Sequence, residues 1–130
     1  MKPTKRTPCP CGRPRIFDAC CRPLIEGQGV AHDAESLMRS RYSAFATGAV
    51  DYLRASWHPS TRPTELDLDD NPRWISLSIV RSETTGDATA IVEFIARYRV
   101  GGRAQALHEI SRFVREDGRW YYVDGDIQGD

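Results

Sequence analysis

Residues 92–114 read VEFIARYRVGGRAQALHEISRFV, and side chains of like character recur in this stretch at every second position. One face of the first half is apolar and consists of Val92, Phe94, Ala96, Tyr98 and Val100. In the second half Leu107, Glu109, Ser111 and Phe113 share one face, and His108, Ile110 and Val114 share the other. A period of two indicates β-strands, and the Gly101-Gly102 pair between the runs is typical of a tight hairpin turn. The stretch therefore predicts two paired antiparallel strands.

The same period extends to both sides of this hairpin. Upstream, Ile75, Leu77 and Ile79 alternate with polar residues, and residues 120–127 form a further strand-like run. Asp124 and Asp126 are expected on the same face of that last strand as Trp120 and Tyr122. Turn residues separate the runs at 85–87 and 117–118. The prediction is a meander of four long antiparallel strands.

Helices are predicted before the strands. Asp33 is a suitable N-cap and Gly48 a suitable stop for a helix over 34–47. At 100° per residue its apolar side chains fall in one arc, which also contains Arg41. We expect Arg41 to face the core or a cavity and to need an acidic partner there. A short helical piece follows at 51–56 and ends at Trp57-His58-Pro59, and residues 58–72 are predicted to form a surface loop. Helices followed by a meander predict an α+β domain with a helix on one face of the sheet.

Composition limits the class of protein. The chain has 130 residues, of which 40% are hydrophobic and 28% charged, and it contains no apolar run of about 20 residues, the length that spans a bilayer. The first residues are basic but no apolar stretch follows them, so a secretory signal is not expected. We therefore expect a globular, cytoplasmic protein that does not enter the membrane.

The zero net charge hides an asymmetry. Residues 1–23 carry six basic groups and one acid, whereas residues 24–130 carry 12 basic and 17 acidic groups. All four cysteines also lie in the basic part. This shift predicts a small N-terminal unit over 1–23 and a second unit over 24–130, with the boundary near Pro23. The basic unit could contact an acidic partner, a nucleic acid or the acidic remainder of the chain.

The cysteines are Cys9, Cys11, Cys20 and Cys21. Four thiolates within 13 residues can surround one zinc ion tetrahedrally, which would close its coordination shell and make the zinc structural. Metal binding would then supply the folding free energy of a segment that has no apolar core. Two disulfides, a redox-active cysteine and an iron–sulfur cluster remain alternatives; the first is disfavoured by a reducing cytosol and the last by the spacing.

This cysteine pattern resembles the SEC-C motif, found at the C-terminus of the bacterial preprotein translocase ATPase and in many small bacterial proteins. The matching residues are Cys9, Cys11, Gly12, Phe17, Cys20 and Cys21. The usual Ser-Gly after the first glycine is Arg13-Pro14 here. In the translocase the motif recognises an export chaperone and contacts the ribosome. The resemblance thus implies a zinc site and a protein or ribosome-associated partner. From the basic charge of the segment we expect Arg13, Arg15 and Arg22 to make the contact.

A second resemblance covers nearly the whole chain. The segments LMRSRYSAF over 37–45, WHP over 57–59, RF over 112–113 and GRWYY over 118–122 are similar to those of the YchJ family. These bacterial proteins join a SEC-C motif to a domain similar to nuclear transport factor 2 (NTF2). The resemblance implies a cone-shaped fold, in which a curved sheet wraps helices around a pocket, but it implies no reaction.

The polar residues of the second unit suggest what such a pocket could contain. Arg41 and Glu109 both lie on otherwise apolar faces, and they are predicted either to bind a small polar ligand or to pair with each other. Tyr42 and Trp57 are candidate pocket walls, and a pocket filled by aromatic side chains would favour a scaffold role. His108 is expected to be a packing or surface residue. Arg97, Arg99 and Arg103 raise the alternative of nucleic-acid binding, but no set of stacking aromatics accompanies them.

Two functions follow from these patterns. The first is a non-catalytic adaptor whose basic zinc unit docks on a protein or ribonucleoprotein. The second is a small-molecule-binding protein or an enzyme that uses Arg41 and Glu109. An unpaired Arg41 and Glu109 in one open pocket would favour the second function.

Overall fold

The alternating residues form one antiparallel sheet. The computed structural model describes residues 7–68 and 71–128. Its strands are β1 (Arg73–Gly86), β2 (Thr89–Val100), β3 (Arg103–Glu116) and β4 (Arg119–Ile127). They pair in the order β1-β2-β3-β4, so the predicted meander is confirmed. The β3–β4 turn places Asp117 and Gly118 at positive φ, a conformation that an Asp-Gly pair adopts readily.

Register shifts change the faces that a strict period of two predicts, and two of them concern residues near the core and the cavity. In β1 the register shifts between Trp74 and Ser76, so Trp74 faces the core while Ile75 is 47% exposed. In β4 it shifts after Tyr122, which pairs with Phe113, whereas Asp124 pairs with Arg112. The expectation that Asp124 shares a face with Tyr122 is therefore wrong. An extra residue in a bulged strand reverses the facing of every residue beyond it.

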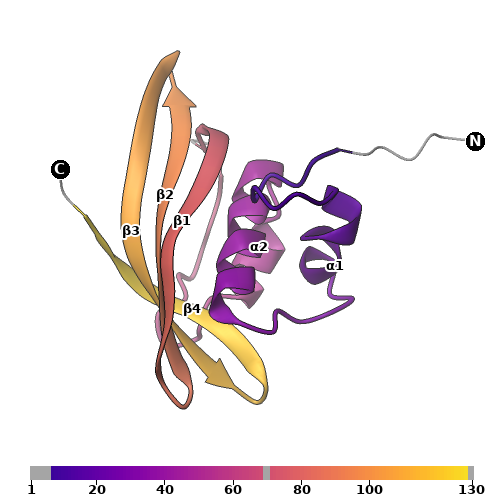
Figure 1. Cartoon of the computed structure of the whole chain (residues 1–130), viewed down its shortest axis with the longest axis vertical. Coiled ribbons are helices and arrows are strands. Elements are labelled where there is room, and N and C mark those ends of the chain that lie inside the picture. Colours follow the sequence, from indigo (N-terminus) through magenta and orange to yellow (C-terminus); the bar gives the residue numbers. More distant parts are fainter. Residues whose placement is uncertain (1–6, 69–70, 129–130) are drawn as a thin grey trace, which may run out of the picture.

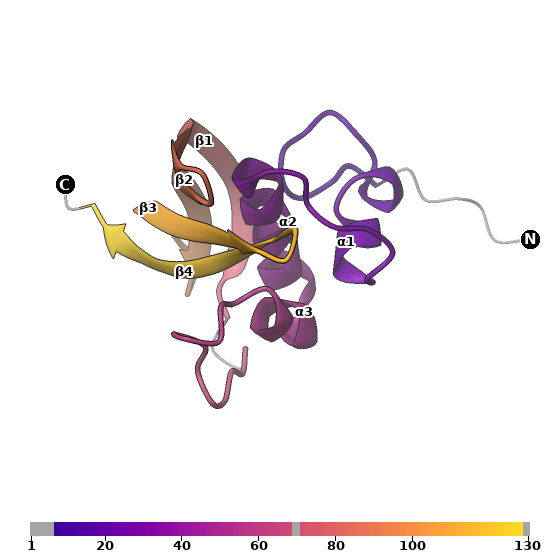
Figure 2. The same ribbon diagram turned by 90° about the horizontal axis from the view of Figure 1, so that it is seen from below.

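Helix α2 (Ala34–Thr47) covers one face of this sheet, and α3 (Val50–Ala55) lies beside α2 (Figures 1 and 2). The Asp33 side chain accepts a hydrogen bond of 2.8 Å from the Ser36 backbone N–H, and Gly48 ends the helix at φ 79°. Both predicted helix limits are confirmed. The α+β class is confirmed as well, with the sheet curving around α2.

The main core lies between α2 and the inner face of the sheet. Its buried members come from both layers: Ala31, Ala34, Leu37, Met38, Tyr42, Leu77, Ala90, Val92, Phe94, Ala96 and Phe113. Half-buried apolar side chains, both aromatic and aliphatic, pack against it. The core therefore joins α2 to three strands of the sheet.

The N-terminal segment packs on the side of α2 that faces away from the sheet (Figure 1). It contains a short 3₁₀-helix, η1 (Phe17–Ala19), and α1 (Arg22–Ile25). The predicted boundary at Pro23 falls inside α1, and its position stays a prediction. We call residues 7–26 the head. No helix in the described part of the chain is long and apolar enough to cross a membrane.

Candidate metal centre and candidate ligand cavity

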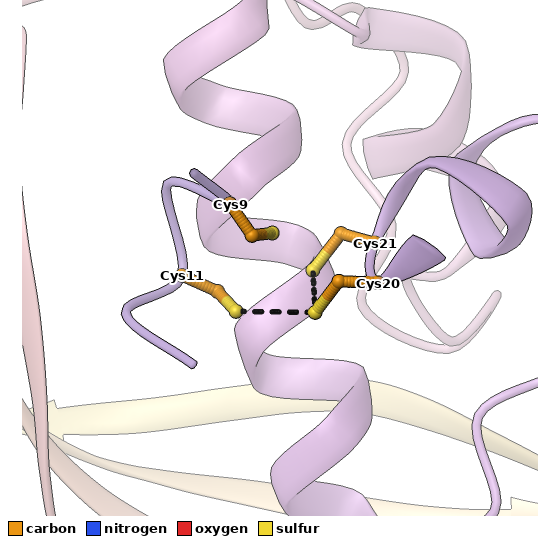
Figure 3. A group of neighbouring side chains, drawn as sticks. All are labelled: Cys9, Cys11, Cys20 and Cys21. Carbon is orange, nitrogen blue, oxygen red and sulfur yellow. Dashed lines mark hydrogen bonds between the residues drawn. The ribbon is translucent and has the colours of Figure 1, made fainter. Parts of the chain in front are cut away.

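The four cysteines of the head point toward a common centre (Figure 3). Cys9 and Cys11 lie on a loop that is closed by a bridge between Pro8 and Ile16. Cys20 and Cys21 lie at the junction of η1 and α1. All four sulfur atoms are within 4.8 Å of one another, and all four thiols are free. Two short elements thus bring together residues that are up to 12 positions apart.

The spacing of the sulfur atoms fits a tetrahedral metal ion. A zinc ion with four Zn–S bonds of about 2.3 Å would place its sulfur atoms about 3.8 Å apart. The Sγ atoms of Cys11 and Cys20 are 3.7 Å apart, and those of Cys20 and Cys21 are 4.0 Å apart. Cys11 is fully buried and Cys21 nearly so. These residues fit a closed four-sulfur site without rearrangement.

The electrostatics of the cluster also favour a cation. Burial, reinforced by the neighbouring sulfur atoms of Cys9 and Cys11, raises the pKa of the Cys20 thiol to about 12. Crowded buried thiols therefore cannot all ionise by themselves. A bound divalent cation supplies the charge that four thiolates need.

The cluster is fixed to α2 by polar contacts. The Sγ of Cys9 lies 3.6 Å from the Oγ of Ser43, which is fully buried. Nη1 of Arg39 donates a hydrogen bond of 2.7 Å to the backbone carbonyl of Cys11. Arg13 donates to the Oγ of Ser36 at 3.2 Å. The head is therefore positioned by α2, and these contacts would orient the metal ligands.

Two of the three predicted contact arginines are engaged within the chain. Arg13 lies 3.7 Å from Glu35, on α2. Arg22 forms ion pairs of 2.8 Å with both Asp18 and Glu26. Arg15 is exposed, and no acid of the described residues forms an ion pair with it. Of the three, only Arg15 presents an uncompensated charge in the described structure.

A partly enclosed cavity of about 300 Å³ lies between α2 and the sheet. All four predicted pocket residues line it, namely Arg41, Tyr42, Trp57 and Glu109. The remaining lining residues are mostly apolar or aromatic: Met38, Phe45, Trp74, Phe94, Ala96, Leu107, Ser111 and Tyr122. The aromatic side chains surround the cavity and leave it open. Trp120 lines a different groove, of about 280 Å³, between the chain at 24–31, α3 and the β3–β4 turn.

Arg41 is buried, with 3% of its surface exposed, and it is held without an acid. Nη1 donates to the carbonyl of Leu53 at 2.8 Å and to the Oγ of Ser56 at 2.7 Å. The guanidinium also stacks on the Tyr122 and Trp57 rings, 4.6 and 5.1 Å from their centroids. No ion pair joins Arg41 to an acid among the residues the structure describes, so the predicted acidic partner is wrong. Carbonyl dipoles and aromatic faces satisfy the cation instead.

Burial lowers the pKa of Arg41 to about 10, with a smaller opposing effect from Tyr122, Tyr52 and Glu109. A group with that pKa remains charged at neutral pH. The cavity wall therefore carries a fixed positive charge next to apolar surface.

Glu109 supplies the opposite charge. Its Oε2 accepts a hydrogen bond of 2.6 Å from the Oγ of Ser111 and a longer one of 3.4 Å from the hydroxyl of Tyr122. Burial, followed by the nearby carboxylate, raises the pKa of Tyr122 to about 12, so this hydroxyl keeps its proton. Gly125 leaves the space that the carboxylate occupies, because a side chain there would collide with Glu109. Three residues thus position one carboxylate.

Sequence reasoning missed some of this environment. The sequence could have indicated Ser111, because Ser111 follows Glu109 by two positions and therefore lies on the same strand face. The sequence could not indicate Tyr122 and Gly125 together, because the β4 bulge decides which residues of that strand face the cavity.

Outside the cavity, polar residues form surface networks. His108 pairs with Glu93 at 2.6 Å on the outer sheet face, and Glu93 also pairs with Arg81. Arg112 binds Asp124 and Asp126 on the same face. Arg97, Arg99 and Arg103 are exposed near the β2–β3 turn, at the end of the sheet that rises beyond α2 (Figure 1). The sheet separates the outer-face groups from the cavity, whereas Arg103 shares the inner face with Leu107 and Glu109 but does not line the cavity.

Comparison with known proteins agrees with this arrangement of elements. Residues 33–125 match the family model described as the middle NTF2-like domain of YchJ. The chain is 55% identical to a UPF0225 protein of Xanthomonas campestris, over 95% of this chain and 98% of that protein. It is 52% identical to a UPF0225 protein of Bordetella parapertussis, over 97% of both chains.

Solved structures of two related proteins have the same arrangement of elements. The solution structure of a SEC-C motif-containing protein from Rhodopseudomonas palustris superposes with a TM-score of 0.83 at 36% identity, covering 93% of this chain and 98% of that one. A crystal structure of a SEC-C motif-containing protein from Psychrobacter arcticus gives 0.78 at 28% identity, with 94% and 83% covered.

Fold and cysteine cluster together define an NTF2-like α+β protein with an N-terminal SEC-C motif. The chain belongs to the YchJ family, among whose relatives are the UPF0225 proteins.

Proposed function

We propose that this protein binds a small, mainly apolar molecule in the cavity between α2 and the sheet, and that a structural zinc ion holds the head against α2. The observation that carries the proposal is the placement of Arg41 and Glu109 on one open cavity without an ion pair between them. Buried opposite charges that serve stability alone are expected to pair. Two charges that are fixed separately by other groups support a role toward a third molecule.

The shape and lining of the cavity also support small-molecule binding. A volume of about 300 Å³ lies at the lower end of the range of ligand pockets, which are mostly apolar with a few placed polar groups. The aromatic walls would supply most of the binding free energy, and the polar pair would orient the ligand. The proposed role is binding, and no catalytic step is assigned.

Zinc is proposed as the metal because four sulfur ligands at tetrahedral spacing suit it. Such a site has no position for a substrate, so the proposed role of the ion is structural. We place the protein in the cytoplasm, where the thiols would stay reduced and available to the ion.

Screening a neutral fragment library by thermal shift on the zinc-loaded protein tests the ligand proposal. Fragments that raise the melting temperature should lose their effect in Leu107→Trp, because the larger ring fills the cavity. The matched control is Ala106→Trp, which places the same ring on the exposed outer face. Stabilisation that persists in Leu107→Trp, or its absence across the library, would contradict the proposal.

Partner docking by the head is a second proposed function, favoured by the exposed Arg15, which forms no ion pair with a described residue. A protein or ribosome-associated partner with an acidic surface would suit this charge. Cosedimentation with purified bacterial ribosomes tests it, with Arg15→Ala compared with Arg115→Ala, a distant surface arginine. Equal cosedimentation of the two variants, or none with the unaltered protein, would count against this role.

A further inference from the structure

We infer that the cavity selects neutral molecules that carry both a hydrogen-bond donor and an acceptor, and that it rejects anions and cations of the same shape. This inference rests on the proposed function, because it names the class of ligand that the same cavity would hold. It depends on how Glu109 and Arg41 are each held.

Glu109 offers the ligand an acceptor. Both hydrogen bonds that the carboxylate receives from described residues, from Ser111 and Tyr122, go to Oε2. No described residue donates to Oε1, and Glu109 lines the cavity. A carboxylate has no proton to donate. A ligand group at this wall therefore has to be a donor, and an anionic group there would be repelled.

Arg41 offers the ligand donors. Nη1 is occupied by Leu53 and Ser56, while no described residue accepts from Nε or Nη2. The guanidinium has no acceptor to offer. Its position is fixed by the stacked Trp57 and Tyr122 rings, so it cannot turn away from a bound cation. A ligand group at this wall has to be an acceptor, and a cationic group there would be repelled.

The two charges together give the cavity no net charge. An anion is attracted by Arg41 and repelled by Glu109. A cation is attracted by Glu109 and repelled by Arg41. In either case the ligand's own charge has to leave water for a mainly apolar cavity, which is unfavourable unless the charge finds a partner there. A neutral donor–acceptor group avoids this cost and can satisfy both walls. The apolar lining adds burial of the rest of the molecule.

Three probes of nearly the same shape test this selectivity: benzamide, benzoate and benzylamine. Their dissociation constants are measured at pH 7 by ¹H–¹⁵N NMR titration of the zinc-loaded full chain, following signals of cavity residues. We expect benzamide to bind about tenfold more tightly than either charged probe. Equal or tighter binding of benzoate or benzylamine would overturn the inference and leave the proposed function standing. Absence of cavity shifts with all three probes would contradict the proposed function itself.

Glu109→Gln supplies the decisive variant. Glutamine keeps the size of the side chain and an acceptor for Ser111, but it leaves the charge of Arg41 uncompensated. Benzoate should then bind about tenfold more tightly than it does to the unaltered protein, and it should overtake benzamide. The control is Glu83→Gln, an exposed residue of β1, which should leave the three affinities unchanged. An unaltered ranking in Glu109→Gln would overturn the inference.

Discussion

At the scale of single residues, Gly125 leaves the space that the Glu109 carboxyl group occupies at the cavity wall. A Cβ at this position would lie within contact of the Glu109 carboxyl group, closer than real atoms approach. Gly125 does not have a positive φ, so the backbone itself would accept alanine. The glycine therefore provides space for the carboxylate.

Gly125→Ala should turn the flexible Glu109 carboxylate away from Ser111 and lower the free energy of unfolding by about 1 kcal/mol, because the hydrogen bond from Ser111 is lost. Urea unfolding measures this cost. The matched experiment introduces the same change into Glu109→Ala, where the colliding group is gone. The cost of the glycine change should nearly vanish there, and an equal cost in both backgrounds would show that Glu109 is not the cause.

Arg41 is a second residue whose surroundings predict a clear effect. Arg41→Ala removes two hydrogen bonds and two ring contacts, and it leaves a void beside the cavity. We expect a loss of about 3 kcal/mol in the free energy of unfolding, measured by urea titration. A loss below about 1 kcal/mol would mean that Arg41 contributes to function without supporting the fold. Arg115→Ala, on the surface, is the control.

At the scale of elements, one face of α2 lines the cavity and another contacts the head. Arg41, Tyr42 and Phe45 face the cavity, whereas Ser36 and Ser43 contact the head. The serines on the head side are small, which lets the cysteine loop approach the helix closely. One helix thus connects the proposed metal centre to the proposed ligand cavity.

The N-cap of α2 gives a prediction at this scale. Asp33→Ala removes the acceptor for the Ser36 N–H and should lower the free energy of unfolding by about 1 kcal/mol. Asp33→Asn, which keeps a capping oxygen, should restore most of that loss. Thermal and urea unfolding of the two variants measure this difference in stability. Equal stability of both variants would contradict the capping role assigned to Asp33.

The limits of α2 and the four strands could be predicted because local signals specify them. Asp33, Gly48 and the turn glycines act through their own backbone, and the period of two runs through long strands. The bulges at Ile75 and Val123 have no comparable local signal, because they depend on how neighbouring strands pair.

The candidate site could be predicted from the sequence only in part, for the same reason. Arg41 and Glu109 were visible as polar residues on apolar faces, but the partners of Arg41 come from α3 and β4, whose packing only the fold determines.

At the scale of the whole molecule, the head and the α+β domain are joined by contacts as well as by the chain. Arg39 binds the cysteine loop, and Gly12 approaches the carbonyl of Leu77 on β1. Loss of the metal is therefore expected to affect more than the head.

Cys20→Ser removes one metal ligand and should unfold the head. The sheet should remain folded, with a lower midpoint in urea because the contacts of Arg39 and Ser43 are lost. NMR signals of the head and the sheet report the two parts separately, and Ala19→Ser, an exposed neighbour, is the control. Loss of the dispersed signals of β2 and β3 would show one cooperative unit and would contradict a boundary near Pro23.

The most direct test of the ligand cavity uses the three tryptophan indoles of the chain. Trp57 and Trp74 line the cavity, whereas Trp120 lies in the other groove, so one spectrum distinguishes the two places. The measurement is the ¹⁵N indole spectrum of the zinc-loaded protein during titration with benzamide. Binding in the cavity predicts that the Trp57 and Trp74 signals move together and that the Trp120 signal stays in place. Three unmoved signals, or movement of Trp120 alone, would contradict the account.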